Sequence, residues 1–180
     1  AVTNFSYSYA KRIMAIQIEN YNKQYQKNWN YLIPCNLYGE YDEFDNFKSH
    51  MVSALIKKIY EAELYLNLLG TGKPLRQFMY AKDLARIIKL IIDEQIYENL
   101  NIAPPENFTI KEIAEIGLKA CNKRHLKIKW DPSKPDGQFR KDVTSKKLMN
   151  IFPNFSFTTL EEGIRITHKG YKNNIIGGHT

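Results

Sequence analysis

The chain has 180 residues and a formal net charge of +7 at pH 7. Its length suffices for one domain with a hydrophobic core, and it has no apolar run long enough to span a membrane. The first residues lack the charged segment followed by an apolar one that marks a secretory signal peptide. Cys35 and Cys121 have no metal-ligand spacing and indicate reduced thiols in a cytoplasmic protein.

The positive charge is compatible with two classes of partner. Nucleic-acid binders concentrate Lys and Arg on one surface, but only residues 121–130 (CNKRHLKIKW) form a dense basic group here. A solvated helix end followed by an edge strand also explains that group. A small ligand with two phosphates would use the same charge through fewer residues. We therefore expect a nucleotide-type ligand and no nucleic acid.

The spacing of apolar residues predicts the elements in chain order. The first half is predicted to contain a long helix over 7–26, a buried strand over 29–36, a loop over 37–47, a helix over 49–63, a strand over 64–69 that ends in the turn GTGKP, a short strand over 76–80 and a helix over 81–94. The turn GTGKPL lacks a third glycine and opens no helix, so it is not a dinucleotide-binding fingerprint.

The second half continues the alternation of strands and helices. A strand is predicted over 100–103, a helix over 108–121, a strand with period two over 126–130, a polar loop over 131–141 and a last helix over 158–171. The helix over 108–121 has a capping box, with Thr109 as N-cap and Glu112 three residues later. Thr158 or Thr159 caps the last helix. The alternation predicts an α/β architecture.

Tyr7 and Lys11 form the pattern Tyr-x-x-x-Lys at the start of the first helix. About one such match is expected by chance in a chain of this composition, so the spacing alone is compatible with an ordinary surface pair. Residues four apart share one helix face, however, and an ammonium stabilises a nearby phenolate. Such a tyrosine can protonate an alkoxide, as carbonyl–alcohol redox reactions with a nicotinamide require.

Four segments, in this order, resemble the GDP-L-fucose synthase family of extended short-chain dehydrogenase/reductases. They are SYAKR (8–12), IPCNLYGEYDEFDNFKSHM (33–51), LLGTGKPLRQFMYAKDLA (68–85) and SKPDGQFRK (133–141). The Tyr/Lys pair is shared by the whole superfamily, whereas NLYG, DNF, SH and SKPDG are narrower. The resemblance covers about residues 5–171 and corresponds to the family's second half.

The resemblance implies the C-terminal part of a Rossmann-like parallel sheet with a smaller α/β substrate lobe. Residues 1–48 would belong to the NADP-binding domain, and residues 49–180 mainly to the GDP-sugar lobe, with some segments returning to the sheet. It further implies NADPH-dependent 3,5-epimerisation and 4-reduction of GDP-4-keto-6-deoxy-D-mannose to GDP-L-fucose, in a cytoplasmic homodimer whose long helices pack across a two-fold axis. "RIMAIQI" (12–18) is apolar over more than one face, as a helix covered on two sides should be.

The family resemblance assigns the catalytic and cofactor roles. Tyr7 would protonate the C4 oxyanion, and Lys11 would hold the nicotinamide ribose and tune Tyr7. Pro34, Cys35, Asn36 and Leu37 would line the nicotinamide, with Cys35 a small filler rather than a nucleophile. His50, which also borders the cofactor, would be the acid that protonates the sugar during epimerisation; the near-neutral pKa of histidine suits that role.

The substrate would be held by five residues, none of them a metal ligand. Lys58, Arg76 and Lys141 would meet the diphosphate and sugar, since a guanidinium can fork to phosphate. Asp136 would accept hydrogen bonds from the ligand. Leu69 stands where the family has a tryptophan that stacks on guanine.

Two departures from the family pattern leave alternatives open. The glycine-rich phosphate loop and the family's serine and cysteine before the tyrosine are not in the 180 residues, so we expect this chain alone to be inactive. Leu69 leaves open an epimerase or reductase acting on another nucleotide-linked 4-keto sugar. A non-catalytic C-terminal piece is the remaining alternative.

Overall fold

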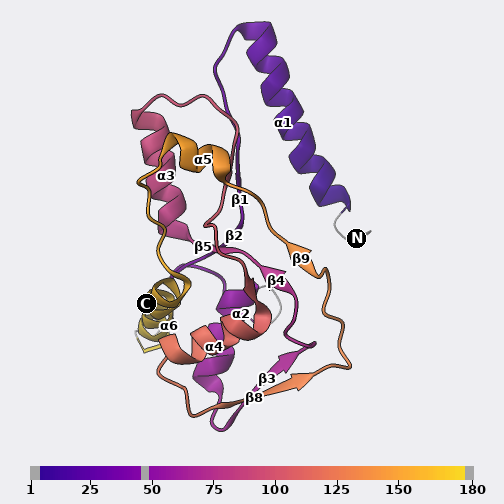
Figure 1. Cartoon of the computed structure of the whole chain (residues 1–180), viewed down its shortest axis with the longest axis vertical. Helices are drawn as coiled ribbons and strands as arrows, with labels where there is room; N and C mark the ends of the chain where they lie inside the picture. Colours follow the sequence, from indigo (N-terminus) through magenta and orange to yellow (C-terminus); the bar gives the residue numbers. More distant parts are fainter. Residues whose placement is uncertain (1–4, 46–48, 177–180) are drawn as a thin grey trace.

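The computed structural model describes residues 5–45 and 49–176 as an α/β fold (Figure 1). Its helices are α1 (Phe5–Tyr25), α2 (Met51–Glu61), α3 (Ala81–Asp93), α4 (Ile110–Ala120), α5 (Lys146–Ile151) and α6 (Leu160–Ile176). Its strands are β1 (Leu32–Pro34), β2 (Asn36–Tyr38), β3 (Tyr65–Leu69), β4 (Leu75–Arg76), β5 (Phe78–Tyr80), β6 (Leu100–Ile102), β7 (Phe108–Thr109), β8 (Lys127–Asp131) and β9 (Arg140–Lys141).

Most strand pairs are parallel, as the alternation of strands and helices predicts. β1 pairs with β6, β2 with β5 and β3 with β8, each in parallel register. β4 joins the remaining two strands, antiparallel to β7 and parallel to β9. The predicted α/β class is therefore confirmed.

Two hydrophobic clusters stabilise the fold. The larger one joins α2, α4 and α6 to β3, β5 and the end of β2, with Ile56 and Ile113 fully buried. The smaller one joins β6, α3 and α5, with Ile87 and Leu148 at its centre. The partly buried Leu32 and Leu37 before residue 49 pack against the smaller cluster, together with segments from later in the chain. The boundary after residue 48 stays a prediction.

Particular residues account for two local features of the fold, the start of α4 and the close approach of α6 to β2. The capping box predicted for Thr109 and Glu112 is confirmed: the Thr109 side chain accepts from the Glu112 amide at 3.1 Å, and Glu112 accepts from the Thr109 amide at 2.7 Å. Gly163 on α6 lies where a Cβ would come within 2.1 Å of the Tyr38 hydroxyl. A side chain there would push α6 away from the end of β2.

Several strand predictions were too coarse. The predicted strand over 29–36 is two strands. The first, β1, pairs with β6 up to Pro34, and the second, β2, pairs with β5. Between them, the Cys35 amide donates to the Ile102 carbonyl at 2.9 Å. β2 extends into the predicted loop as far as Tyr38. The predicted strand over 76–80 is also split, into β4 and β5, and the helix α5 and the short strands β7 and β9 were not predicted.

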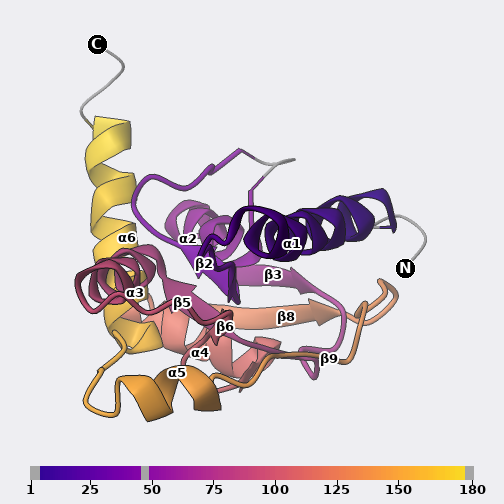
Figure 2. The same cartoon turned by 90° about the horizontal axis from the view of Figure 1, so that it is seen from above.

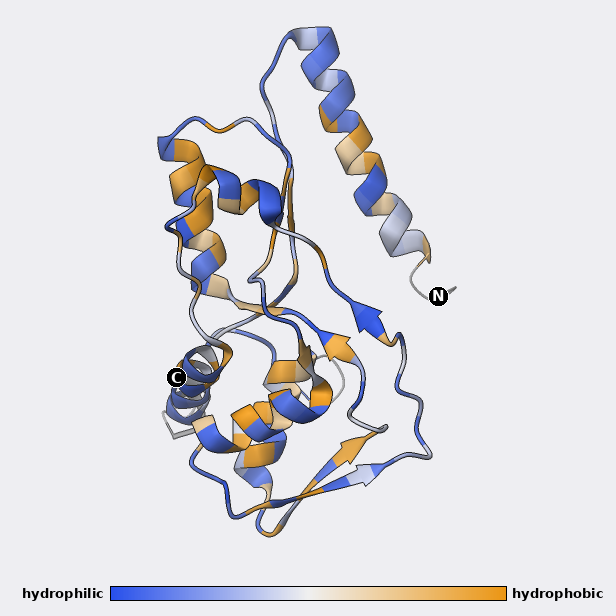
Figure 3. Ribbon diagram, viewed as in Figure 1, coloured by the Kyte–Doolittle hydropathy of each residue, from blue (hydrophilic) through white to orange (hydrophobic). Residues whose placement is uncertain are grey.

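Helix α1 stands beside the packed elements rather than among them (Figure 1). None of its residues is buried, and Ile13 and Met14 are 51% and 55% exposed. Hydropathy colouring shows apolar positions in the middle of α1, which stands apart from the other helices in this view (Figure 3). Both views place α3 and α6 on one side of the molecule, and β9 and the start of α1 on the other (Figure 1, Figure 2).

Candidate functional site

The Tyr7 and Lys11 side chains lie on one face of α1. The Lys11 ammonium is 5.6 Å from the centre of the Tyr7 ring, as expected for side chains one helical turn apart. Tyr7 is 67% exposed, so the described residues leave its hydroxyl accessible. The two side chains are thus close enough to act on one ligand, and the catalytic role of the pair stays a prediction.

The turn after α1 fixes this helix relative to β1. Gln26 adopts a left-handed conformation with φ of 49° and ends the helix. The Asn22 side chain then bonds the Trp29 backbone twice, accepting from the amide at 2.9 Å and donating to the carbonyl at 2.7 Å. Tyr21 stacks on the Trp29 ring at 5.6 Å. These contacts connect the Tyr7–Lys11 helix to the strand that ends at Pro34.

Residues 34–37 lie at the crossing from β1 to β2, at the carboxyl end of a parallel strand. Cofactors bind at this end in doubly wound folds. Asn36 is fixed by a bond from its side-chain amide to the Gln77 carbonyl at 3.0 Å. Burial raises the pKa of the Cys35 thiol to about 12, which disfavours the thiolate and agrees with a filler role. Both cysteines are free thiols.

His50 is the N-cap residue of α2, and its side chain is 72% exposed. Its Nδ1 lies 3.5 Å from Oδ1 of Asp42, which follows β2. Oδ2 of Asp42 accepts a hydrogen bond from the Ser53 hydroxyl. The predicted acid is thus next to a carboxylate that the sequence analysis did not single out.

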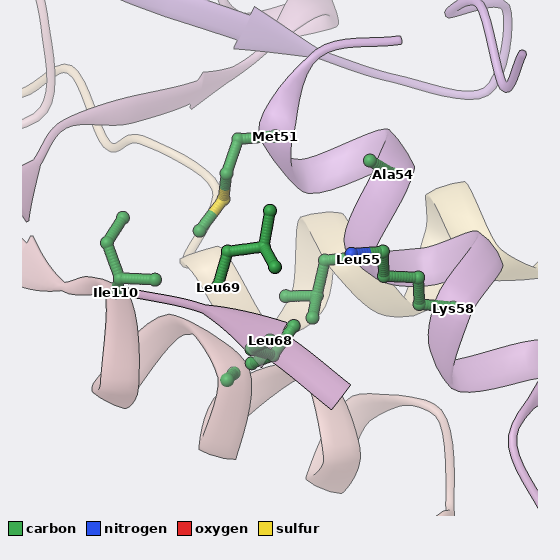
Figure 4. A pocket seen from close by; sticks show the side chains of 8 residues that line it. Met51, Ala54, Leu55, Lys58, Leu68, Leu69 and Ile110 are labelled. Atoms are coloured by element: carbon green, nitrogen blue, oxygen red, sulfur yellow. The ribbon is translucent and has the colours of Figure 1, made fainter. Parts of the chain in front are cut away.

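A largely apolar pocket of about 180 Å³ lies between α2, the end of β3 and the start of α4 (Figure 4). Two predicted substrate residues, Lys58 and Leu69, line it. The other lining residues were not predicted and are apolar: Met51, Ala54, Leu55, Leu68, Ile110 and Ala114. Lys58 is the one charged side chain in this set, so the pocket suits a group with apolar faces and a nearby negative charge.

The ladder between β4 and β9 brings together Arg76 and Lys141, which are far apart in the sequence. The two residues are direct partners in the parallel register. Among the residues that the structure describes, no carboxylate lies within ion-pair distance of either cation. Like charges in paired positions destabilise a sheet, so an anion that bridges them would relieve this cost.

Asp136 is part of a clamp between two turns. Its carboxylate accepts from the Thr71 amide and from the Thr71 hydroxyl, each at 2.6 Å. These bonds hold the pKa of the Asp136 carboxyl below its usual value. Gly70, with φ of 78°, allows the close approach, because a Cβ there would come within 2.2 Å of the carboxylate. Each oxygen keeps a further lone pair, so ligand binding by Asp136 stays a prediction.

Within residues 5–45 and 49–176, no group of three or more His, Cys, Asp or Glu side chains is placed to hold a metal ion. None of the helices in these same ranges has both the length and the apolar character needed to cross a membrane.

Parallel strand pairs alternate with helices along the chain, and the first helix carries a Tyr/Lys pair on one face. These features are compatible with a nucleotide-binding α/β fold. A model of the NAD dependent epimerase/dehydratase family matches residues 2–103, which is more than half of the chain. The chain belongs to this family.

Individual relatives show which members of this family the chain resembles. The chain is 32% identical to a probable GDP-L-fucose synthase of Drosophila melanogaster, over 96% of this chain and 57% of the relative. It is 34% identical to a GDP-L-colitose synthase of Yersinia pseudotuberculosis, over 95% and 57%. A GDP-L-fucose synthetase of Naegleria fowleri bound to NADP superposes with a TM-score of 0.88 at 29% identity, over 98% and 58%. The chain therefore spans little more than half the length of these relatives.

Proposed function

We propose that these residues belong to an enzyme that converts GDP-4-keto-6-deoxy-D-mannose into GDP-L-fucose by 3,5-epimerisation and NADPH-dependent 4-reduction. The observation that carries the proposal is the β4–β9 ladder, because it aligns Arg76 with Lys141 without a carboxylate partner among the described residues. Both residues were expected to contact the diphosphate. The side of the molecule that bears β9 also bears the start of α1, where Tyr7 and Lys11 lie (Figure 2).

The reduction step uses the pair on α1. Tyr7 would give its phenolic proton to the C4 oxygen, and the neighbouring Lys11 ammonium would stabilise the resulting phenolate. NADPH supplies the hydride when it is bound. Residues 34–37, at the carboxyl end of β1, would border the nicotinamide, and Lys11 its ribose. These residues fit the nicotinamide end of the cofactor. The described residues include no glycine-rich turn that opens a helix to hold its pyrophosphate.

The epimerisation step needs an acid and a base on the sugar ring. His50 would be the acid, and its exposed side chain at the start of α2 is free to approach a ligand. The base would be the family's cysteine upstream of the tyrosine. The pocket lined by Lys58 and Leu69 would hold the nucleoside part of the substrate, next to the same helix.

Leu69 favours a second candidate, an enzyme of the same type with another nucleotide-linked 4-keto sugar as substrate. The pocket around Leu69 is lined by aliphatic side chains, Met51 and Lys58, and by no aromatic ring. It therefore offers a base less stacking energy than an aromatic platform would. A GDP-L-colitose synthase among the similar proteins shows that the relatives differ in their sugar.

The assembled enzyme would be a cytoplasmic homodimer without a nucleic-acid partner. Support comes from α1, whose apolar side chains such as Ile13 and Ile16 are exposed in the single chain. A long helix of this kind is covered when two copies pack across a two-fold axis. The parts of the enzyme before this segment would cover another face of α1.

Calorimetry with GDP tests the proposed site. Arg76→Ala and Lys141→Ala should each weaken GDP binding by about tenfold to a hundredfold, because each removes a charge-assisted hydrogen bond to phosphate. Lys146→Ala is the matched control, since Lys146 is an exposed lysine on α5 outside the ladder. Equal affinities in all variants would contradict the assignment, and stronger binding of UDP than of GDP would favour the second candidate.

A further inference from the structure

Three polar side chains meet where the loop after β2 reaches the start of α2. Asp42 from the loop lies between His50, the N-cap residue, and Ser53 in the first turn of the helix. Oδ1 of Asp42 is 3.5 Å from Nδ1 of His50, and Oδ2 accepts from the Ser53 hydroxyl. Both oxygens of one carboxylate thus lie near the same helix start, and Oδ1 also accepts from the Glu43 amide at 2.9 Å.

The carboxylate is fixed much more firmly than the imidazole. The side chain of Asp42 is 16% exposed and Ser53 is fully buried, whereas the His50 side chain is 72% exposed. The Asp42 amide also donates to the Gly39 carbonyl at 3.2 Å, which closes a turn in the loop. The buried carboxylate is therefore the group that can set the orientation of the exposed imidazole.

The loop that carries Asp42 is anchored from its other side as well. Glu40 accepts from the Tyr80 hydroxyl at 2.7 Å and from the Lys82 ammonium at 2.8 Å. Lys82 and Tyr80 lie at the junction of β5 and α3, so the loop is tied to the sheet by one end and to α2 by the other. Asp42 is held in place without any contribution from His50.

We propose that Asp42 is a positioning residue that fixes the tautomer of His50. Its carboxylate accepts the Nδ1–H of the ring, because the partner of one ring nitrogen determines which nitrogen carries the proton. Nε2 is then the nitrogen that exchanges protons with a ligand. This role rests on the proposed function, in which His50 is the acid of the epimerisation.

The proton transfer balances with this assignment. The imidazolium begins with protons on both nitrogens. Its Nε2–H bond breaks, the nitrogen keeps the electron pair, and the proton forms a C–H bond with the electron pair of an enolate carbon next to the C4 ketone. The neutral ring that remains is the Nδ1–H tautomer, which is the form that Asp42 stabilises. Without Asp42, the single proton of the neutral ring could move to Nε2. Nε2 would then have no lone pair to take up the proton that the next cycle needs.

Nitrogen NMR on the complete 180-residue chain tests the tautomer without any enzymatic activity. Long-range proton–nitrogen spectra of the ¹⁵N-labelled chain would be recorded at increasing pH until the nitrogen shifts no longer change, so that the neutral ring is observed. The His50 signals are identified by their loss in His50→Gln. Neutral His50 should be mainly the Nδ1–H tautomer in the wild type and mainly the Nε2–H tautomer in Asp42→Asn.

Glu43→Gln is the control, because it removes a carboxylate from the same loop, whose Oε1 contacts the Asp45 amide. This variant should keep the wild-type tautomer. An Nε2–H tautomer in the wild type would overturn the proposal even if Asp42→Asn does not fold, and so would the same tautomer in wild type and a folded Asp42→Asn. Calorimetry with GDP is independent of this result, so failure of the proposed substrate site can be told apart from failure of the Asp42 role.

Discussion

A predicted proton donor lies on helix α1 and another at the N-cap of α2, yet the two helices differ in how much of their surface is buried. α1 buries none of its residues, whereas α2 buries five, including Ile56 and Ile59, against α4 and β3. The Tyr7–Lys11 pair on α1 arises from i,i+4 spacing within one helix, whereas His50 on α2 is placed by a loop that is bonded to other elements.

The contrast between α1 and α2 shows two ways to place a reactive side chain: by spacing within one helix, or by contacts with other parts of the fold. An exposed helix can bring two side chains together, but it cannot by itself exclude water or fix a ligand in front of them. The packed half of the molecule offers a pocket, paired cations and bonded loops. Of the predicted site residues, those assigned to the substrate therefore lie in better packed surroundings than Tyr7 and Lys11 on α1.

The largest expected effect is a difference in ligand binding by the 180-residue chain. We expect measurable, salt-sensitive binding of GDP and no detectable binding of NADPH. Under the proposed function, Lys11 and residues 34–37 would contact only the nicotinamide end, and loss of the pyrophosphate contacts would cost several kcal/mol, on the order of a thousandfold in affinity. Calorimetry with both ligands at two salt concentrations measures this. Micromolar NADPH binding would show that this chain holds a further phosphate site.

The next effect concerns catalysis in a protein that joins these residues to a dinucleotide-binding half. Tyr7→Phe should lower reduction by about a hundredfold or more and leave part of the epimerisation, while His50→Gln should do the reverse, because general acids contribute about that much to each step. Deuterium uptake at C3 and C5 and NADPH oxidation follow the two steps separately. Equal loss of both activities in both variants would refute the division of roles.

A third effect compares the stability contributions of the two helices directly. Ile56→Ala should lower the free energy of unfolding by about 2 to 5 kcal/mol, because it leaves a cavity in the larger cluster. In the monomeric chain, Ile13→Ala, the same change on α1, should alter it by no more than about 0.5 kcal/mol, since Ile13 is 51% exposed there. Urea unfolding monitored by circular dichroism measures both. A large loss in Ile13→Ala would mean that α1 is packed in solution, as in a dimer.

The helices of the described residues, except the short α5, could be predicted from the sequence because their signals are local. The apolar period and the Thr109–Glu112 box placed α4 to within a few residues. The split strands could not, because the breaks depend on distant partners. Cys35 ends one pairing by bonding to the Ile102 carbonyl, and the buried Gln77 separates β4 from β5 by bonding to Pro104 and Val143.

The same distinction between local signals and distant partners applies to the candidate site. The Tyr7–Lys11 contact could be predicted from spacing alone. The pairing of Arg76 with Lys141 depends on the register of two strands 65 residues apart, and only the family resemblance pointed to both residues. Asp42 was missed because an acidic residue in a polar loop carries no periodic signal. It lies shortly before α2, whose N-cap position is His50.

The smallest expected effect is a pH dependence of stability in the packed half. His168 on α6 is buried, its Nε2 has no hydrogen-bond partner among the described residues, and Tyr60 lies beside its ring. Burial, and secondarily the charges of Lys172 and Lys123, lowers its pKa from 6.5 to about 4. Between these values the unfolded chain binds a proton at this position and the folded chain does not.

Stability should therefore fall as pH decreases from 6.5 to about 4, with no further loss from His168 below that range. One proton sets the upper limit of the slope, about 1.4 kcal/mol per pH unit. His168→Gln removes this share while the carboxylates titrate in both proteins, so the difference between the two urea-unfolding curves isolates it. The two curves should converge toward low pH or cross, because only the wild type is penalised there. Curves that stay parallel from pH 7 to pH 4 would show that His168 accepts a proton as readily in the folded chain as in the unfolded one, and would contradict the lowered pKa.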